Sequence, residues 1–165
     1  MMDVSLRRFV PSDMQWVVAR HQDLYAREAG FDASFGVLVA DILQRFCASH
    51  DPACERGWVA VGGGERLGTI FCMREDAETA RLRLFLLTPK ARGQGLGKRL
   101  LRECVGFARA AGYGAMVLHT HESHRSARAL YQAFGWQMTG AGPVHSYGQD
   151  LVQQTWRLQL RTDAG

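Results

Sequence analysis

The sequence has no long hydrophobic segment. A membrane-spanning helix needs about 20 consecutive apolar residues, and no stretch of the 165 residues approaches that length. The first residues, Met1 to Val10, alternate polar and apolar side chains and lack the apolar centre of a signal peptide. The sequence therefore predicts a cytoplasmic protein without a membrane partner.

Cysteine is scarce and follows no paired pattern. Cys47, Cys54, Cys72 and Cys104 are widely spaced and form no Cys-x-x-Cys motif. Most of them sit among apolar residues, as reduced thiols do in intracellular proteins. We therefore assign these four thiols no chemistry.

A strong charge of one sign is also missing. The formal net charge is only +4 and is spread along the chain. A nucleic-acid-binding face needs clustered cations, so we expect no nucleic-acid partner. The length of 165 residues and the apolar fraction of 47% suit one compact soluble domain over residues 1–165.

Hydrophobic periodicity predicts a mixed α/β protein whose sheet is largely antiparallel. Apolar residues at helical spacing predict helices over residues 12–28, 34–47, 95–111 and 126–134. Short or alternating apolar runs predict strands over residues 4–9, 58–61, 67–73, 81–87, 115–120 and 156–160. Ser12 and Gln15 have capping-box spacing at the start of the first helix, and Gly30 would end it. Residues 162–165 are predicted to form a frayed tail.

The most informative segment runs from Arg92 to Lys98 and reads Arg-Gly-Gln-Gly-Leu-Gly-Lys. It lies between a predicted strand and a predicted helix. Glycines let a backbone approach a ligand closely, and a helix start offers unpaired N–H groups and the positive end of a dipole. Arg92, Lys98 and Arg99 add formal positive charge. The segment therefore predicts a site for the pyrophosphate of a nucleotide-like ligand.

Other ligand-binding loops share this strand–loop–helix pattern. The segment lacks the Gly-Lys-Ser/Thr ending of a nucleoside triphosphatase loop. It also occurs in the middle of the chain after a predicted antiparallel hairpin, whereas a dinucleotide-binding loop opens the first unit of a parallel fold. On the loop alone, a glycine-rich turn that only caps a helix stays an alternative.

A second motif further along the chain narrows the interpretation. The pair Arg92-x-x-Gly95-x-Gly97 and Ala129-Leu130-Tyr131-x-x-Phe134-Gly135-Trp136 resembles the acyl-CoA signature and the C-terminal helix motif of the GNAT acetyltransferase superfamily. The order of predicted elements is similar to that fold over nearly the whole chain. The resemblance implies an α+β fold: a mixed, mostly antiparallel sheet of six to seven strands with splayed central strands, flanked by about four helices. It also implies acetyl-CoA as cosubstrate and no metal.

The same resemblance implies which residues bind the donor. The backbone of Phe85, Leu86 and Leu87 would contact the pantetheine arm, and His124 stands where relatives often have an asparagine that contacts the cofactor. The pyrophosphate would be held by Arg92, Gly93, Gln94, Gly95, Leu96, Gly97 and Lys98.

Tyr131 matches the tyrosine that protonates the leaving thiolate of coenzyme A in the family. A phenol with a pKa of about 10 is protonated at neutral pH and lies within about two units of a thiol near 8.5. Taken alone, Tyr131 would more readily be a core-facing helix residue, and the motif context reverses this preference.

The acceptor amine must lose a proton before it can attack the thioester. A lysine-like amine with a pKa near 10.4 costs about 4.6 kcal/mol to deprotonate at pH 7, whereas an α-amine near 7.8 costs about 1 kcal/mol. Glu28, at the end of the first predicted helix, is one candidate base. His119 is the other, because relatives that acetylate N-termini carry a glutamate base there and a near-neutral pKa suits the task.

A closer resemblance concerns Arg20-His21, Tyr25-x-x-Glu28-x-Gly30-Phe31-Asp32 and His145-Ser146-Tyr147-Gly148. These segments are similar to GNAT domains often fused behind a MarR-type DNA-binding domain, of which we expect only the acetyltransferase part here. The resemblance implies an acceptor pocket whose aromatic walls and carboxylates suit a cationic amine. Each residue alone would equally fit a solvated helix end or a surface loop. The implied pocket residues are Tyr25, Glu28, Phe31, Asp32, His145, Tyr147 and Asp150.

The function implied is that of an N-acetyltransferase (EC 2.3.1 type) acting on the primary amine of a small molecule or peptide by direct attack, with Tyr131 as general acid. A non-catalytic acyl-CoA sensor and an enzyme for protein N-termini or lysines are the alternatives.

A further interpretation treats His119, His121, Glu122, His124 and His145 as a metal site, although the family needs no metal. The acceptor, the acyl length and the oligomeric state, including a homodimer, stay open.

Overall fold

The computed structural model describes residues 3–161. In this part of the chain seven strands form one sheet in the order β1-β2-β3-β4-β5-β7-β6. Only the β4–β5 pair in this described sheet is parallel, and the other neighbours are antiparallel. The predicted mixed, mostly antiparallel α/β architecture is confirmed. The tail predicted at Thr162–Gly165 lies outside the described residues.

The elements alternate along the chain much as the periodicity predicts. In chain order they are β1 (Val4–Arg8), η1 (Pro11–Asp13), α1 (Met14–Ala29), α2 (Ala33–Ser49), β2 (Arg56–Gly62), β3 (Glu65–Arg74), β4 (Thr79–Leu87), η2 (Pro89–Ala91), α3 (Leu96–Ala110), β5 (Ala115–His121), α4 (Arg125–Phe134), β6 (Gln137–Ser146) and β7 (Gln149–Gln159).

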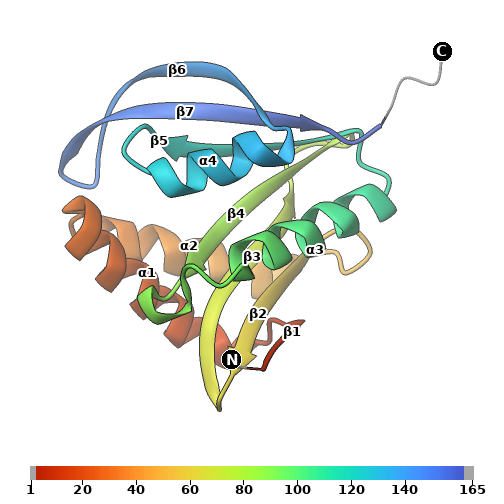
Figure 1. The fold of residues 1–165 in the computed structure, drawn as a ribbon, viewed down its shortest axis with the longest axis horizontal. Coiled ribbons are helices and arrows are strands. Elements are labelled where there is room, and N and C mark those ends of the chain that lie inside the picture. Colours follow the sequence, from red (N-terminus) through yellow and green to blue (C-terminus); the bar gives the residue numbers. More distant parts are fainter. Residues whose placement is uncertain (1–2, 162–165) are drawn as a thin grey trace.

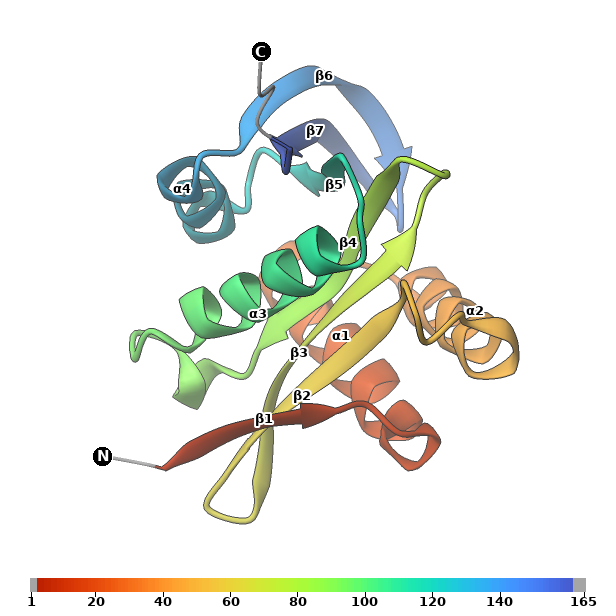
Figure 2. The ribbon, with the colours of Figure 1, turned by 90° about the vertical axis from the view of Figure 1, so that its right-hand side faces the viewer.

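The helices cover both faces of the sheet, with α1 and α2 on one face and α3 and α4 on the other (Figure 2). This layering follows from the alternation of side chains along a strand. On β3, Ile70 and Cys72 belong to the core under α3, whereas Phe71 and Met73 belong to the core under α1 and α2. Both faces of the central strands are therefore buried.

The two parallel strands β4 and β5 pair over only three residues each, Thr79–Arg81 with Ala115–Val117, and then diverge (Figure 1). A bulge in β4 accompanies this separation, because the pairing with β3 shifts between Thr69 and Phe71. Leu84 lies in the bulge with a positive φ of 50°, and its carbonyl accepts a hydrogen bond from Thr69 Oγ1 at 2.8 Å. Bulges of this kind often occur beside active sites.

The start of α1 differs from the predicted capping box. The carboxylate of Asp13, rather than the side chain of Gln15, accepts a hydrogen bond from the Val10 N–H at 2.9 Å. A 3-10 turn beginning at Pro11 precedes the helix. The predicted end is confirmed, since Gly30 has a φ of 71° and donates to the Ala26 carbonyl at 3.1 Å.

The sequence analysis missed strand β6 and the first half of β7. Glycines and Pro143 interrupt the apolar pattern of β6. A proline cannot donate a ladder hydrogen bond and is tolerated on an edge strand, and β6 is an edge strand with β7 as its neighbour. Because its glycines and proline are typical of turns, the sequence did not predict this edge strand.

Two further features concern the helices and the cysteines of the described chain. No helix within residues 3–161 is long and apolar enough to cross a membrane. All four cysteines are free, and Cys72 and Cys104 are fully buried.

Candidate active site

A cavity of about 790 Å³ opens where β4 and β5 diverge. We call residues 92–98 the glycine loop. The cavity is lined by residues of α1, α2, β4, the glycine loop, β5, α4 and the β6–β7 hairpin. We call it the central cavity. It joins the predicted donor loop to most of the predicted acceptor residues.

The glycine loop adopts the geometry of an anion site. Gly93 and Gly95 have φ values of 78° and 79°, a conformation that a side chain would strain. Gly95 precedes α3, whose first-turn N–H groups lack intrahelical partners. Gly97 is buried, and a Cβ there would lie 3.4 Å from Leu87 and from Leu130, so α3 approaches β4 and α4 closely. Within the loop, Arg92, Gly93, Gly95, Gly97 and Lys98 line the central cavity.

Arg92 and Glu28 form a two-pronged ion pair across the mouth of the cavity. Arg92 Nη1 donates to Glu28 Oε1 at 2.7 Å, and Nη2 donates to Oε2 at 3.2 Å. The pair links the end of α1 to the donor loop. Glu28 therefore contacts the residue predicted to bind the pyrophosphate, and both of its carboxylate oxygens are engaged.

The β4 residues Phe85, Leu86 and Leu87 line the central cavity. Beyond Arg81, β4 has no strand partner on its β5 side in the described sheet. Backbone N–H and C=O groups are obligatory hydrogen-bonding groups. This free strand edge can therefore pair with the amides of an extended ligand.

Tyr131 lies on α4, is 5% exposed and lines the central cavity. Its ring packs against Phe85 at a centroid distance of 6.3 Å, Trp136 at 5.7 Å and Trp156 at 6.4 Å. Burial, and then the neighbouring Tyr25 and Cys104, raise the pKa of the Tyr131 phenol well above its ordinary value. The group is therefore protonated at neutral pH.

His119 lines the central cavity from the end of β5 and remains largely exposed. Its Nδ1 lies 3.1 Å from Thr155 Oγ1. Partial burial, followed by the nearby cations Arg81 and Arg83, lowers its pKa below the usual 6.5. The imidazole is therefore largely neutral at pH 7 and can accept a proton.

The rings of His121 and His124 lie against each other in a tilted arrangement, with centroids 4.3 Å apart and an interplanar angle of 50°. Burial and the proximity of His124 lower the pKa of His121 to about 4, and burial also lowers the pKa of His124. His124 lies against Tyr25 at 5.1 Å. No group of three or more His, Cys, Asp or Glu side chains within residues 3–161 is arranged to hold a metal ion.

Four aromatic rings form one wall of the central cavity, and we call them the aromatic cluster: Tyr25, Phe31, Phe35 and Tyr147. Their centroids are 4.6 to 5.3 Å apart in every contacting pair. The cluster ties α1 and α2 to the β6–β7 turn. Tyr25, Phe31 and Tyr147 come together as the resemblance implies. Phe35 was missed, because its helical spacing indicates a core residue.

Two of the predicted carboxylates, Asp32 and Asp150, do not line the cavity. Asp32 caps α2, where its Oδ1 accepts a hydrogen bond from the Ser34 N–H at 3.0 Å. His145 and Asp150 pair with each other at 2.8 Å, with side chains 70% and 94% exposed. Arg81 and Arg83 of β4 line the cavity instead. The acceptor end is thus more cationic than the sequence analysis expected.

His21 is a cavity residue whose role the sequence analysis did not identify. It is 2% exposed, and its Nδ1 lies 2.8 Å from the Val17 carbonyl. Burial lowers its pKa to about 4, so the neutral ring donates from Nδ1 to that carbonyl. Nε2 is buried and has no hydrogen-bond partner among the described residues.

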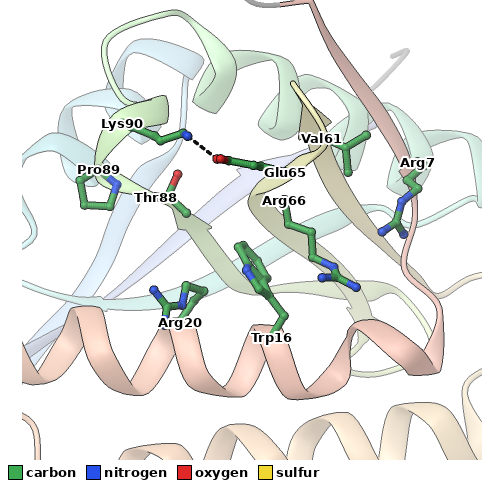
Figure 3. A pocket seen from close by; sticks show the side chains of 10 residues that line it. Arg7, Trp16, Arg20, Val61, Glu65, Arg66, Thr88, Pro89 and Lys90 are labelled. Atoms are coloured by element: carbon green, nitrogen blue, oxygen red, sulfur yellow. Dashed lines mark ion pairs between the residues drawn. The ribbon is translucent and has the colours of Figure 1, made fainter.

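A second cavity, of about 860 Å³, lies between α1 and the β2–β3 hairpin (Figure 3). Each of its cations already has an acidic partner. Arg7 and Arg66 pair with Asp13, Arg20 pairs with Asp23, and Lys90 pairs with Glu65. Because these charges have protein partners, we place the candidate active site in the central cavity.

Comparison with known proteins shows the family to which the chain belongs. A sequence model described as the acetyltransferase (GNAT) family matches residues 17–136. Human N-acetyltransferase 8B is 37% identical over 97 residues, which are 56% of this chain and 43% of that protein. Rat N-acetyltransferase 8F1 is 33% identical over 125 residues, 73% of this chain and 51% of that protein. The chain thus spans about half the length of the curated relatives it matches.

Solved structures share the fold over nearly the full chain. The yncA protein of Salmonella typhimurium, solved with acetyl-CoA, has a TM-score of 0.80 at 20% identity and covers 98% of this chain and 96% of its own. The ribosomal-protein-S18-alanine N-acetyltransferase of Escherichia coli has a TM-score of 0.74 at 18% identity, covering 99% and 97%. At these identities the likeness concerns the fold.

Proposed function

Because the chain belongs to the acetyltransferase (GNAT) family, we propose that it transfers an acetyl group from acetyl-CoA to a primary amine. One observation carries the proposal. The glycine loop, the free edge of β4 and the buried phenol of Tyr131 all open into the same cavity. An anion cradle, a backbone edge and a proton donor suit acyl transfer from a coenzyme A thioester.

The donor half of the cavity suits the chemistry of coenzyme A. The first-turn N–H groups of α3 would bind the pyrophosphate, with Arg92 and Lys98 adding charge. The pantetheine amides would pair with the free edge of β4 at Phe85, Leu86 and Leu87. The related fold of the Salmonella protein holds acetyl-CoA, which supports this assignment.

The proposed reaction is a direct attack. The amine nitrogen bonds to the thioester carbonyl carbon, and backbone N–H groups at the β4 bulge stabilise the oxyanion. When the tetrahedral intermediate collapses, the C–S bond breaks and Tyr131 gives its proton to the thiolate. Cys72 and Cys104 are fully buried and do not line the central cavity, which supports transfer without an acylated cysteine.

His119 is the better candidate for the base that takes the amine proton. Its pKa is lowered, so the neutral form is available at pH 7. The carboxylate of Glu28, in contrast, is engaged by Arg92. Glu28 then helps to place Arg92 for the pyrophosphate.

We expect His119→Gln to lower kcat/KM at pH 7 by about 100-fold. In the wild type, kcat/KM should fall as the pH drops through the His119 pKa, below 6.5, because the protonated ring cannot accept a proton. The pH–rate profile of the variant should lack this acid limb. His50→Gln, outside the cavity lining, is the control. An unchanged acid limb in His119→Gln would show that another group is the base.

The experiment that tests the proposal measures coenzyme A release from acetyl-CoA with a panel of small amines, amino acids and peptides. We expect release that depends on an amine, together with an acetylated product of matching mass. Binding of acetyl-CoA without turnover on any amine would instead favour the acyl-CoA sensor. Peptides that outperform every small amine would favour a protein acetyltransferase.

Four further predictions from the sequence stay predictions. They are a single acetyltransferase domain over residues 1–165, a cytoplasmic location, a homodimer as one possible assembly, and a relationship to domains fused behind MarR-type DNA-binding domains. The proposal itself needs none of them.

A further inference from the structure

Arg83 is a cation without a protein partner at the acceptor end of the central cavity. It lies on β4, is half-buried, and lines the cavity. Among residues 3–161 its guanidinium makes no ion pair within 4 Å and no side-chain hydrogen bond. Burial, and then the neighbouring Arg81, lower its pKa to about 10. The folded chain therefore holds this charge at a cost.

No neighbouring acidic side chain of the described chain forms an ion pair with the Arg83 guanidinium. Glu28 is the one acidic side chain of the described cavity lining, and it pairs with Arg92. Glu75 lies 3.8 Å from Arg81 and makes no contact of this kind with Arg83. The Nε atom of Arg81 is itself buried without a partner in the described chain. Two adjacent guanidinium groups on one face of β4 thus retain free donors.

We propose that Arg83, assisted by Arg81, binds a carboxylate on the acceptor, so that the substrate is an amino acid or a derivative with a free carboxylate and a primary amine. This inference rests on the proposed acetyl transfer. A guanidinium presents donors in a planar fork that matches a carboxylate with two hydrogen bonds. Within the described chain, the unpaired guanidinium of Arg83 and the partnerless Nε of Arg81 supply such donors, while Arg81 Nη1 lies 3.8 Å from Glu75.

The surrounding residues suit the other parts of such a molecule. His119 lies close enough to both arginines for them to lower its pKa, which places the candidate base beside the proposed carboxylate site. The aromatic cluster forms an apolar wall of the same cavity, where the side chain of the amino acid can pack. A simple amine would leave the arginines without a carboxylate, and a polyamine would bring a second positive charge to them.

The test compares acceptors that differ only in the carboxylate. L-Phenylalanine, L-phenylalaninamide and phenethylamine are titrated against the full chain saturated with coenzyme A, and a leucine series repeats the comparison. We expect the amino acid to bind about 10- to 100-fold more tightly than its amide, as for a charged hydrogen-bonded pair. Arg83→Gln should remove that preference without weakening the binding of the amide or of coenzyme A, and Arg83→Lys should restore part of it.

Arg45→Gln is the matched control, because this α2 arginine has a 79% exposed side chain paired with Asp41 and lies outside the cavity lining. It removes a nearby charge and should leave the preference intact. Equal binding of acid and amide in both series overturns the inference, as does an equal loss of both in Arg83→Gln. Binding needs no turnover. A carboxylate preference without coenzyme A release from acetyl-CoA would therefore contradict the acetyl transfer alone.

Discussion

Replacing Tyr131 with phenylalanine is expected to lower kcat for acetyl transfer by about 10²- to 10⁴-fold. The change removes the proton that the departing thiolate needs and keeps the ring that packs against Phe85, Trp136 and Trp156. The KM for acetyl-CoA should stay close to the wild-type value, since in the proposed mechanism the phenol acts only when the C–S bond breaks. Steady-state kinetics at saturating amine measure the effect.

Tyr113→Phe is the control for the loss of a buried phenol. Tyr113 is also 5% exposed, and its hydroxyl donates to the Cys54 carbonyl at 2.8 Å, away from the central cavity. This variant should lose some stability and keep its kcat. Wild-type kcat in Tyr131→Phe would remove Tyr131 from the proposed mechanism.

The buried position of Tyr131 changes the acid–base argument made from the sequence. An ordinary phenol lies within about two pKa units of an ordinary thiol, but burial raises the pKa of Tyr131. Desolvation also disfavours a thiolate in the same cavity and raises the thiol pKa. Because both groups shift in the same direction, the proton transfer from Tyr131 to the thiolate stays feasible.

Asp13→Ala is expected to lower the free energy of unfolding by about 2–3 kcal/mol, because the carboxylate is fully buried while its two arginine partners are 39% and 36% exposed and can be hydrated. The Asp13 side chain is fully buried and accepts hydrogen bonds from Arg7 at 2.8 Å, from Arg66 at 2.9 Å and from the Val10 N–H at 2.9 Å. These contacts join β1, the start of α1 and β3. Removing the carboxylate leaves two guanidinium groups without their partner, and urea denaturation measures the loss.

The exposed pair of Asp41 and Arg45 supplies the control. Asp41 Oδ2 and Arg45 Nη2 are 3.1 Å apart, and the two side chains are 48% and 79% exposed. Exposed ion pairs contribute about 0–1 kcal/mol to stability. Asp41→Ala should therefore have little effect. A similar loss in both variants would show that the Asp13 network does not hold the N-terminal elements together.

The Asp13 network also makes the stability depend on acid. Burial raises the pKa of Asp13, but hydrogen bonds from Arg7, the Val10 N–H and Arg66 outweigh it and hold that pKa well below its ordinary value. A carboxyl whose folded pKa is lowered stabilises the fold above its unfolded pKa, near 3.9. The wild type should therefore lose this contribution as the pH falls below about 4.

The donor half of the site was predictable because it depends on local backbone chemistry. The glycines at positions 93, 95 and 97 and the helix that follows are contiguous, so the sequence shows them as one motif. Tyr131 could be predicted because it belongs to a second short motif, on a helix whose apolar residues recur at helical spacing. The relative placement of the two motifs follows from the element order, which periodicity largely predicts.

The acceptor half could not be predicted as well, because its residues meet only through the fold. Arg83 is a polar residue on a strand, and whether it faces solvent or a cavity depends on where β5 separates from β4. Asp32 and His145 have the chemistry of a binding site, but a helix cap and an exposed ion pair use them. The Glu28–Arg92 pair joins residues 64 positions apart, and no local pattern indicates it.

The most direct test of the account follows a labelled acetyl group from acetyl-CoA to the acceptor. The full chain is incubated with acetyl-CoA carrying ¹³C in the carbonyl and with an amine from the panel. We predict that the label appears in an amide on the amine nitrogen, in equal amount to the coenzyme A released, while the mass of the protein stays unchanged. Label recovered only as free acetate, or retained in acetyl-CoA with every amine, would contradict the proposed N-acetyltransferase.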